Sequence, residues 1–122
     1  MPVERIAMEE SILISIKKLL GIDEEYTHFD TDLIMHINSA LAILTQIGVG
    51  SSSGFMIEDD SSIWSDFIDD EPTLQSVKTY IALKVRLMFD PPSSSAGIES
   101  INRLTSELEW RLEVTSEQLS ST

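Results

Sequence analysis

Residues 73–92, which read TLQSVKTYIALKVRLMFDPP, constrain the fold more than any other stretch. On a helix of 3.6 residues per turn, apolar side chains cover more than half of its circumference, a wider arc than packing on one neighbour needs. They are Leu74, Val77, Tyr80, Ile81, Leu83, Val85, Leu87, Met88 and Phe89. Pro91 and Pro92 then end the helix, because proline lacks an N–H group and disfavours helical geometry in the residue before it. We therefore predict a central helix that is covered on two or more sides.

Three further segments have the apolar periodicity of amphipathic helices. The first runs from Ala7 to Leu20 and ends at Gly21, as a left-handed C-cap does. The second runs from about Asp30 to Ile47, and glycines follow it. The third runs from about Ala96 to Val114, after serines that can cap its first turn. The sequence therefore predicts an all-α fold, a small bundle of four principal helices.

The segment between the second helix and the central helix is the least regular part of the chain. Residues 48–60 read GVGSSSGFMIEDD, and serines between glycines are typical of a flexible loop. Phe55, Met56 and Ile57 could form a short strand, which would need a partner such as another copy of the chain. A short helical turn follows, in which Trp64 and Phe67 share a face. We expect a long flexible loop here.

The chain has the length of one domain. With 122 residues, we predict a helical domain over residues 8–114, an N-terminal extension over 1–7 and a flexible tail over 115–122. The first ten residues lack the basic and apolar regions of a signal peptide, and the sequence contains no cysteine. No apolar run reaches the ~20 residues of a membrane span. These features predict a soluble intracellular protein.

The charge is strongly negative. The chain has 21 acidic and 8 basic residues, a net charge of −13. Such a surface repels nucleic acids and anionic membranes, and it favours solubility or basic partners. The sequence therefore argues against specific DNA binding and against a membrane partner.

The carboxylates do not form a recognisable catalytic or metal site. The acidic clusters at 58–60 and 66–71 lack the order of a calcium loop. His28 and His36 have no third histidine or cysteine to complete a zinc site. The sequence also lacks a phosphate-binding glycine loop and a nucleophile elbow. We predict no catalytic, cofactor or metal site, and no enzymatic activity.

Several residues are candidates for contacts between subunits, because they depart from the helical pattern of apolar and polar positions or lie in the irregular loop. They are Ile14, Phe55, Met56, Ile57, Lys84 and Trp110. Lys84 falls inside the apolar arc of the central helix, so its stem packs and its ammonium reaches water, or it pairs with an acidic residue of a neighbouring subunit. Trp110 lies on the polar face of the last helix, where either a loop covers it or it anchors an intersubunit contact.

An ordered set of short motifs runs through most of the chain. The set comprises Leu19-Leu20-Gly21-Ile22-Asp23, Phe29-Asp30-Thr31-Asp32, Ile37-Asn38-Ser39-Ala40, Gln46-Ile47-Gly48-Val49-Gly50, Trp64-Ser65-Asp66-Phe67, Val77-Lys78-Thr79-Tyr80-Ile81, Leu87-Met88-Phe89-Asp90-Pro91-Pro92 and Glu107-Leu108-Glu109-Trp110-Arg111-Leu112. Over residues 8–114 the chain resembles the head–tail connector (adaptor, or head-completion) proteins of long-tailed bacteriophages and of prophages of Gram-positive bacteria.

The resemblance implies a helical structural subunit without an active site. Such subunits assemble as a ring, typically dodecameric, beneath the portal protein at the head–tail interface of the virion, after assembly in the host cytoplasm. The ring extends the DNA channel and docks the next connector or terminator protein on the tail side. DNA would pass through the lumen without specific binding.

Two other functions stay open at this point. One is an acidic binding module that mimics DNA, which the charge favours. Against it, the carboxylates are interleaved with Lys78, Arg86, Arg103 and Arg111. The other is a helical magnesium-dependent nucleotide hydrolase, which an activity assay with substitutions in the 66–71 cluster would reveal.

Overall fold

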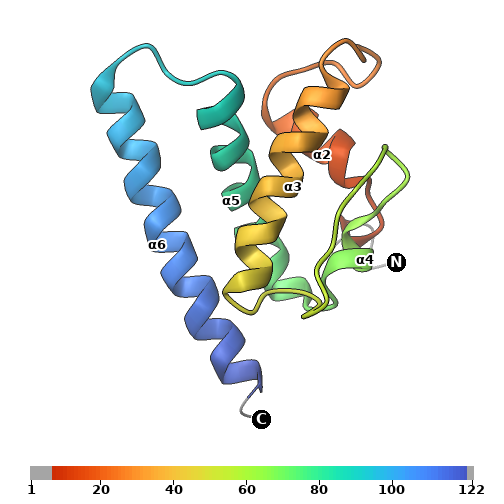
Figure 1. The fold of residues 1–122 in the computed structure, drawn as a ribbon, viewed down its shortest axis with the longest axis vertical. Coiled ribbons are helices and arrows are strands. Elements are labelled where there is room, and N and C mark those ends of the chain that lie inside the picture. Colours follow the sequence, from red (N-terminus) through yellow and green to blue (C-terminus); the bar gives the residue numbers. More distant parts are fainter. Residues whose placement is uncertain (1–6, 121–122) are drawn as a thin grey trace.

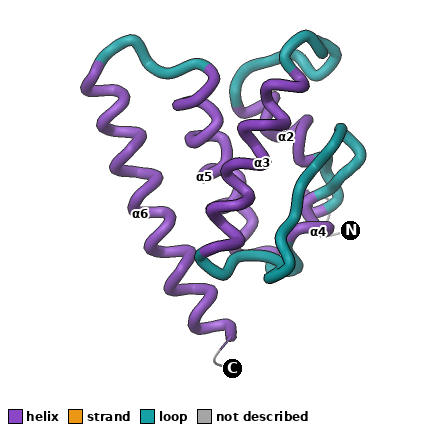
Figure 2. Tube along the Cα trace, in the orientation of Figure 1, coloured by secondary structure: helices purple, strands orange, loops and turns teal. Residues whose placement is uncertain are grey.

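The computed structural model describes residues 7–120, and within them it is built from helices and loops (Figures 1 and 2). The helices are α2 (Ile12–Leu19), α3 (Asp30–Gln46), α4 (Trp64–Phe67), α5 (Glu71–Phe89) and α6 (Ser95–Ser120). The predicted all-α bundle is confirmed. Of the predicted N-terminal extension only Ala7 is described, and the last two residues of the predicted tail also lie outside the described range. Over the described residues, no helix has both the length and the apolar character that crossing a bilayer requires.

Helix α5 is the central element of the bundle, as its wide apolar arc predicts. It packs against α2, α3 and α6, and in Figure 1 it lies between α6 on one side and α3 on the other. Leu74, Val77, Tyr80, Ile81 and Val85 are buried in the core. At the C-terminal end of the arc Met88 is 43% exposed, whereas Phe89 is partly buried and packs against the core.

Helix α2 is shorter than the sequence predicts, because Ser11 interrupts the segment. The Ser11 hydroxyl accepts a hydrogen bond from the backbone N–H of Ile14 at 3.2 Å and caps the helix. Ser11 also forms an isolated antiparallel bridge with Ile63, in the loop before α4. The helix ends as expected, since Gly21 has a positive φ of 78°.

A buried lysine of α2 fixes the loop that leads to α3. Lys17 is fully buried, and its ammonium donates to the carbonyls of Glu24 at 3.0 Å and Tyr26 at 2.7 Å and to Asp30 Oδ1 at 2.9 Å. An ammonium has three N–H donors, so all three are satisfied. Asp30 is the first residue of α3, and its side chain is 25% exposed. The pair therefore joins the end of α2 to the start of α3.

The loop between α3 and α4 contains no strand, so the short strand considered for residues 55–57 does not form within the chain. Instead, the side-chain amide of Asn38 on α3 pairs with the backbone of Ile57, accepting from its N–H at 2.8 Å and donating to its carbonyl at 3.0 Å. The side chains of Val49 and Ile57 are buried in the core. The loop is thus anchored to the bundle at both ends, with the serines at 51–53 exposed between the anchors.

Helix α6 is longer than predicted, and residues 115–120 continue it instead of forming a flexible tail. It begins after Ser94, whose hydroxyl accepts from the N–H of Gly97 at 3.0 Å. Near its end, the Ser116 hydroxyl donates to the carbonyl of Ile47 at 2.9 Å. This tertiary contact explains why the serine-rich end stays helical, since packing overrides a weak local preference.

Candidate subunit interface

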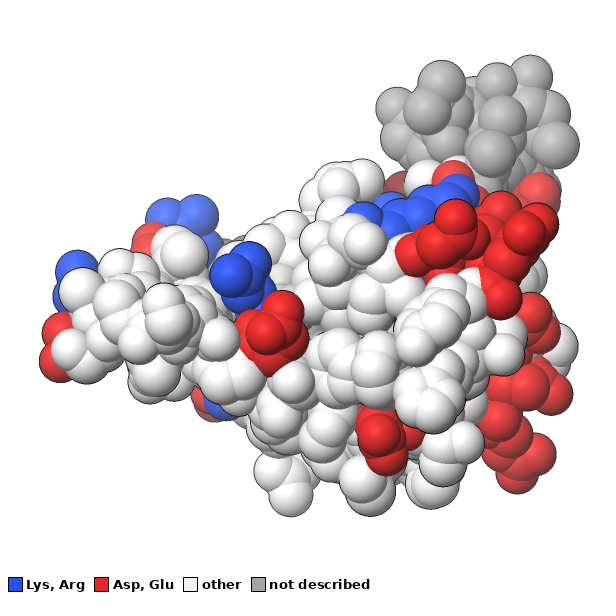
Figure 3. Space-filling model, turned by 90° about the horizontal axis from the view of Figure 1, so that it is seen from above, with Lys and Arg blue, Asp and Glu red and all other residues white. Residues whose placement is uncertain are grey.

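The negative charge is concentrated in one half of the described chain. Residues 7–70 contain thirteen acidic and two basic residues, a net charge of −11, whereas residues 71–120 contain seven acidic and five basic residues, a net charge of −2. In Figure 3 most of the visible carboxylates lie on the side away from α6, with some basic side chains beside them, whereas basic and acidic side chains are mixed at the α6 side. The two sides of the molecule therefore differ in their electrostatic character.

Ion pairs neutralise part of the charge on α6. Lys84 on α5 lies 3.6 Å from Glu109 Oε2, and its ammonium is 5.9 Å from the centre of the Tyr80 ring. Tyr80 is buried and donates its hydroxyl proton to Glu109 at 2.8 Å. Burial, and secondly this hydrogen bond to a carboxylate, raises the pKa of Tyr80 above its ordinary value. Lys84 thus has a carboxylate partner within its own chain.

Trp110 is the largest exposed apolar side chain of the described residues. It is 66% exposed on the outer face of α6, and no loop covers it. Arg111, the next residue, pairs with Glu107 at 2.6 Å. The other tryptophan, Trp64, is fully buried and donates its indole N–H to Ser15 at 3.0 Å. The two tryptophans therefore occupy opposite environments.

An uncharged groove of about 990 Å³ lies between the outer face of α3 and the loop that follows it. Its lining residues are Thr31, Ile34, Met35, Asn38, Ser39, Ala42, Thr45, Gln46, Ser53, Gly54, Phe55 and Met56. Met56 is 71% exposed and Met35 is 59% exposed, although both are large apolar side chains. An exposed apolar concavity inside a strongly acidic half of a protein is typical of a surface that binds a partner.

The structure brings together only some of the predicted contact residues. Phe55 and Met56 lie at the groove, where the Phe55 ring also packs on Phe67 with ring centres 5.5 Å apart. Ile57 is 1% exposed and belongs to the core, so its side chain is not available at the surface. Ile14 is partly buried on α2. Met35 was not predicted as a contact residue, and it also lines the groove.

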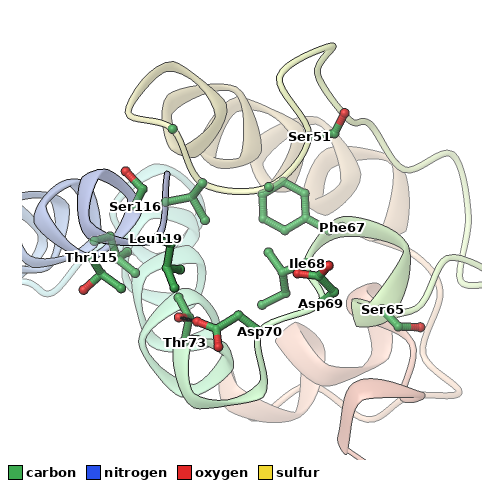
Figure 4. A pocket seen from close by; sticks show the side chains of 14 residues that line it. Ser51, Ser65, Phe67, Ile68, Asp69, Asp70, Thr73, Thr115, Ser116 and Leu119 are labelled. Atoms are coloured by element: carbon green, nitrogen blue, oxygen red, sulfur yellow. Dashed lines mark hydrogen bonds between the residues drawn. The ribbon is translucent and has the colours of Figure 1, made fainter. Parts of the chain in front are cut away.

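A second, smaller pocket of about 520 Å³ lies where the end of α6 meets the loop after α3 and the segment between α4 and α5 (Figure 4). Phe67 and Ile68 lie across this pocket from Leu119 of α6. Gly50 also lines it, with a positive φ of 80°; a Cβ atom there would lie 2.5 Å from the Phe67 ring. The pocket therefore lies at the boundary between the end of α6 and the rest of the bundle.

The carboxylates do not converge on an ion. Among the described residues, no group of three or more histidine, cysteine or acidic side chains is arranged to hold a metal. In the 58–60 cluster, Asp59 accepts hydrogen bonds from the hydroxyl and N–H of Ser61, which lower the pKa of its carboxyl. The cluster is exposed to solvent.

Comparison with known proteins assigns the chain to a family. The model of the phage connector protein family matches residues 12–119, which cover α2 to α6 almost completely. No significant match was found among curated proteins or among solved structures. The match extends beyond the predicted domain end at Val114 and includes the last turns of α6. The chain therefore belongs to the phage connector protein family.

Proposed function

We propose that this chain is the subunit of a ring beneath the portal protein at the head–tail interface of a long-tailed phage or prophage. The family match over residues 12–119 carries the proposal, since this family is a structural connector family of phages. The ring would extend the DNA channel from the portal toward the tail and would dock the next tail-side protein. The subunit would act without catalysis, by shape and charge.

The charge of the subunit supports a role beside moving DNA. Residues 7–70 carry a net charge of −11, and repetition around a ring multiplies it. Phosphates are repelled by such a wall, and a protein that binds DNA non-specifically does so through lysine and arginine. DNA would therefore pass through the lumen without being held. We propose that the subunit assembles in the host cytoplasm, before or while the tail joins the head.

A joining experiment tests this function. A phage that lacks the gene for this chain should accumulate DNA-filled heads and separate tails, and adding the purified chain to a mixture of the two should restore infectious particles. Infectious tailed particles formed without the chain would contradict the proposal.

The distribution of the carboxylates also fits a second function, that of an acidic module that mimics DNA. Most of the visible carboxylates lie on one side of the subunit (Figure 3), as they would in such a module. Such a module would inhibit a DNA-binding protein and would have no effect on the joining of heads and tails. The same joining experiment separates the two functions.

A further inference from the structure

We propose that the ring is built by one specific contact, in which Trp110 on α6 of one subunit enters the uncharged groove beside α3 of the next subunit. This inference rests on the proposed ring, and it names the two surfaces that would meet. The occupant of the groove is thus a second copy of the same chain.

The two surfaces lie on opposite sides of the subunit. Figure 1 shows α6 along one side of the bundle and the loop over residues 51–57 along the other, with α3 and α5 between them. A contact that joins two different surfaces is heterologous, so each subunit keeps one surface free for the next copy. Such contacts close into a ring when the rotation per subunit allows it. Because Trp110 and the groove are different surfaces, their contact can be repeated from copy to copy, whereas a contact of one surface with itself would stop at a dimer.

The chemistry of the two surfaces is complementary. The groove is uncharged and exposes Met35 and Met56, which a large aromatic side chain can cover. Trp110 is a single exposed aromatic residue on a regular helix, and tryptophan is enriched among the residues that contribute most to binding. Burying these surfaces against one another would remove several large apolar side chains from water.

The charges around the two surfaces favour this pairing over a contact between two grooves. Near Trp110 on α6, Arg103 and Arg111 are offset by Glu107, Glu109 and Glu113, so residues 103–113 carry a net charge of only −1. At the groove, Asp32 and Glu58 are exposed close to the lining residues in sequence. Two grooves facing one another would bring two halves of charge −11 together, which is unfavourable. A nearly neutral surface around Trp110 that faces the groove reduces this repulsion.

Disulfide trapping tests the contact, because the natural chain contains no cysteine and gives no background. Ser106 lies one helical turn from Trp110, and Ser39 lines the groove; both are exposed. Assembled material would be formed from equal amounts of Ser106→Cys and Ser39→Cys chains and then oxidised. The control replaces the Ser39→Cys chain by Ser65→Cys, an exposed position of α4 outside the groove.

The proposal predicts a mixed disulfide between Ser106→Cys and Ser39→Cys chains, and little with the Ser65→Cys control. Crosslinks of Ser106→Cys chains only with themselves, or rings without the mixed disulfide, would overturn the contact and leave the ring itself standing. A chain that does not assemble, alone or with portal protein, would instead overturn the ring as well, and this would be visible before any cysteine is introduced.

A truncation of the anchor gives an independent readout. Trp110→Ala should weaken assembly by on the order of tenfold or more, as expected for a central anchor residue. Leu104→Ala is the matched control, since Leu104 is 49% exposed on α6 but lies about a third of a turn round the helix from Trp110. Circular dichroism would verify that both variants are folded. Equal assembly of Trp110→Ala and the wild type would contradict the proposed anchor.

Discussion

Replacement of Lys17 by methionine should destabilise the domain strongly, although lysine is usually a surface residue. Lys17 is fully buried, and its ammonium is the partner of the Asp30 carboxylate and of the carbonyls of Glu24 and Tyr26. Methionine keeps the length and apolar character of the stem but leaves these three acceptors without their donor. The variant therefore isolates the loss of the charge and its hydrogen bonds.

The expected magnitude follows from the burial of the pair. Removing one partner of a fully buried ion pair costs about 3–5 kcal/mol, and because the Asp30 side chain is 25% exposed we expect the lower end, about 3 kcal/mol. For a domain of this size, such a loss lowers the melting temperature by about 10 °C. Denaturant unfolding followed by circular dichroism measures both quantities. The control is Lys18→Met, which changes the exposed neighbour and should alter the free energy of unfolding by less than about 0.5 kcal/mol. A loss below about 1 kcal/mol in Lys17→Met would show that the three acceptors do not depend on the Lys17 ammonium.

Three further predictions concern the remaining tertiary contacts. Burial raises the pKa of Tyr80 above its ordinary value of 10.0, so the stability gained from its neutral hydroxyl is complete below about pH 10 and is lost as the pH rises further. Tyr80→Phe should therefore reduce the loss of stability at alkaline pH, measured by unfolding curves. An unchanged pH dependence would contradict this. Asn38→Ala removes both partners of the Ile57 backbone, so amide exchange at Ile57 should become at least about tenfold faster, whereas unchanged exchange would show that the loop is held elsewhere. Gly50→Ala should lower the free energy of unfolding by about 1–3 kcal/mol, because of the positive φ and the contact with Phe67, and a neutral effect in thermal melts would show that the turn relaxes freely.

The central helix could be predicted from sequence because its signal is local and strong. An apolar arc wider than one neighbour needs, closed by Pro91 and Pro92, indicates a helix that is covered on several sides, and α5 does contact three other helices. The glycine that ends α2 is equally local, since Gly21 has the positive φ that a left-handed cap requires.

The features that the sequence did not predict depend on distant parts of the chain. In the sequence, Lys17 is an ordinary basic residue in the last turn of a helix. It is buried because the loop that follows α2 folds back over its side chain and offers the carbonyl of Tyr26. The strand considered around Ile57 has the right residue types, but the Asn38 side chain takes the place of a neighbouring strand. The end of α6 looks like a frayed tail until Ser116 meets the carbonyl of Ile47.

The residues of the candidate interface also differ in whether their signal in the sequence is local or depends on distant parts of the chain. Trp110 could be identified because it interrupts a polar helical face, and Met56 because it is apolar in an irregular loop. The groove that joins Met56 to Met35 could not be identified, since it depends on how the loop crosses α3. Sequence patterns thus indicate single exposed side chains more readily than the surfaces they form.

The most direct test of the proposed connector ring is the mass of the assembly that the purified chain forms with the portal protein of its phage. Native mass spectrometry over a range of concentrations should show a closed oligomer of one copy number, alone or on the portal ring, and free subunits of 13.6 kDa at low concentration. A subunit that stays monomeric at every concentration and does not bind the portal would contradict the proposal that this chain forms the connector ring.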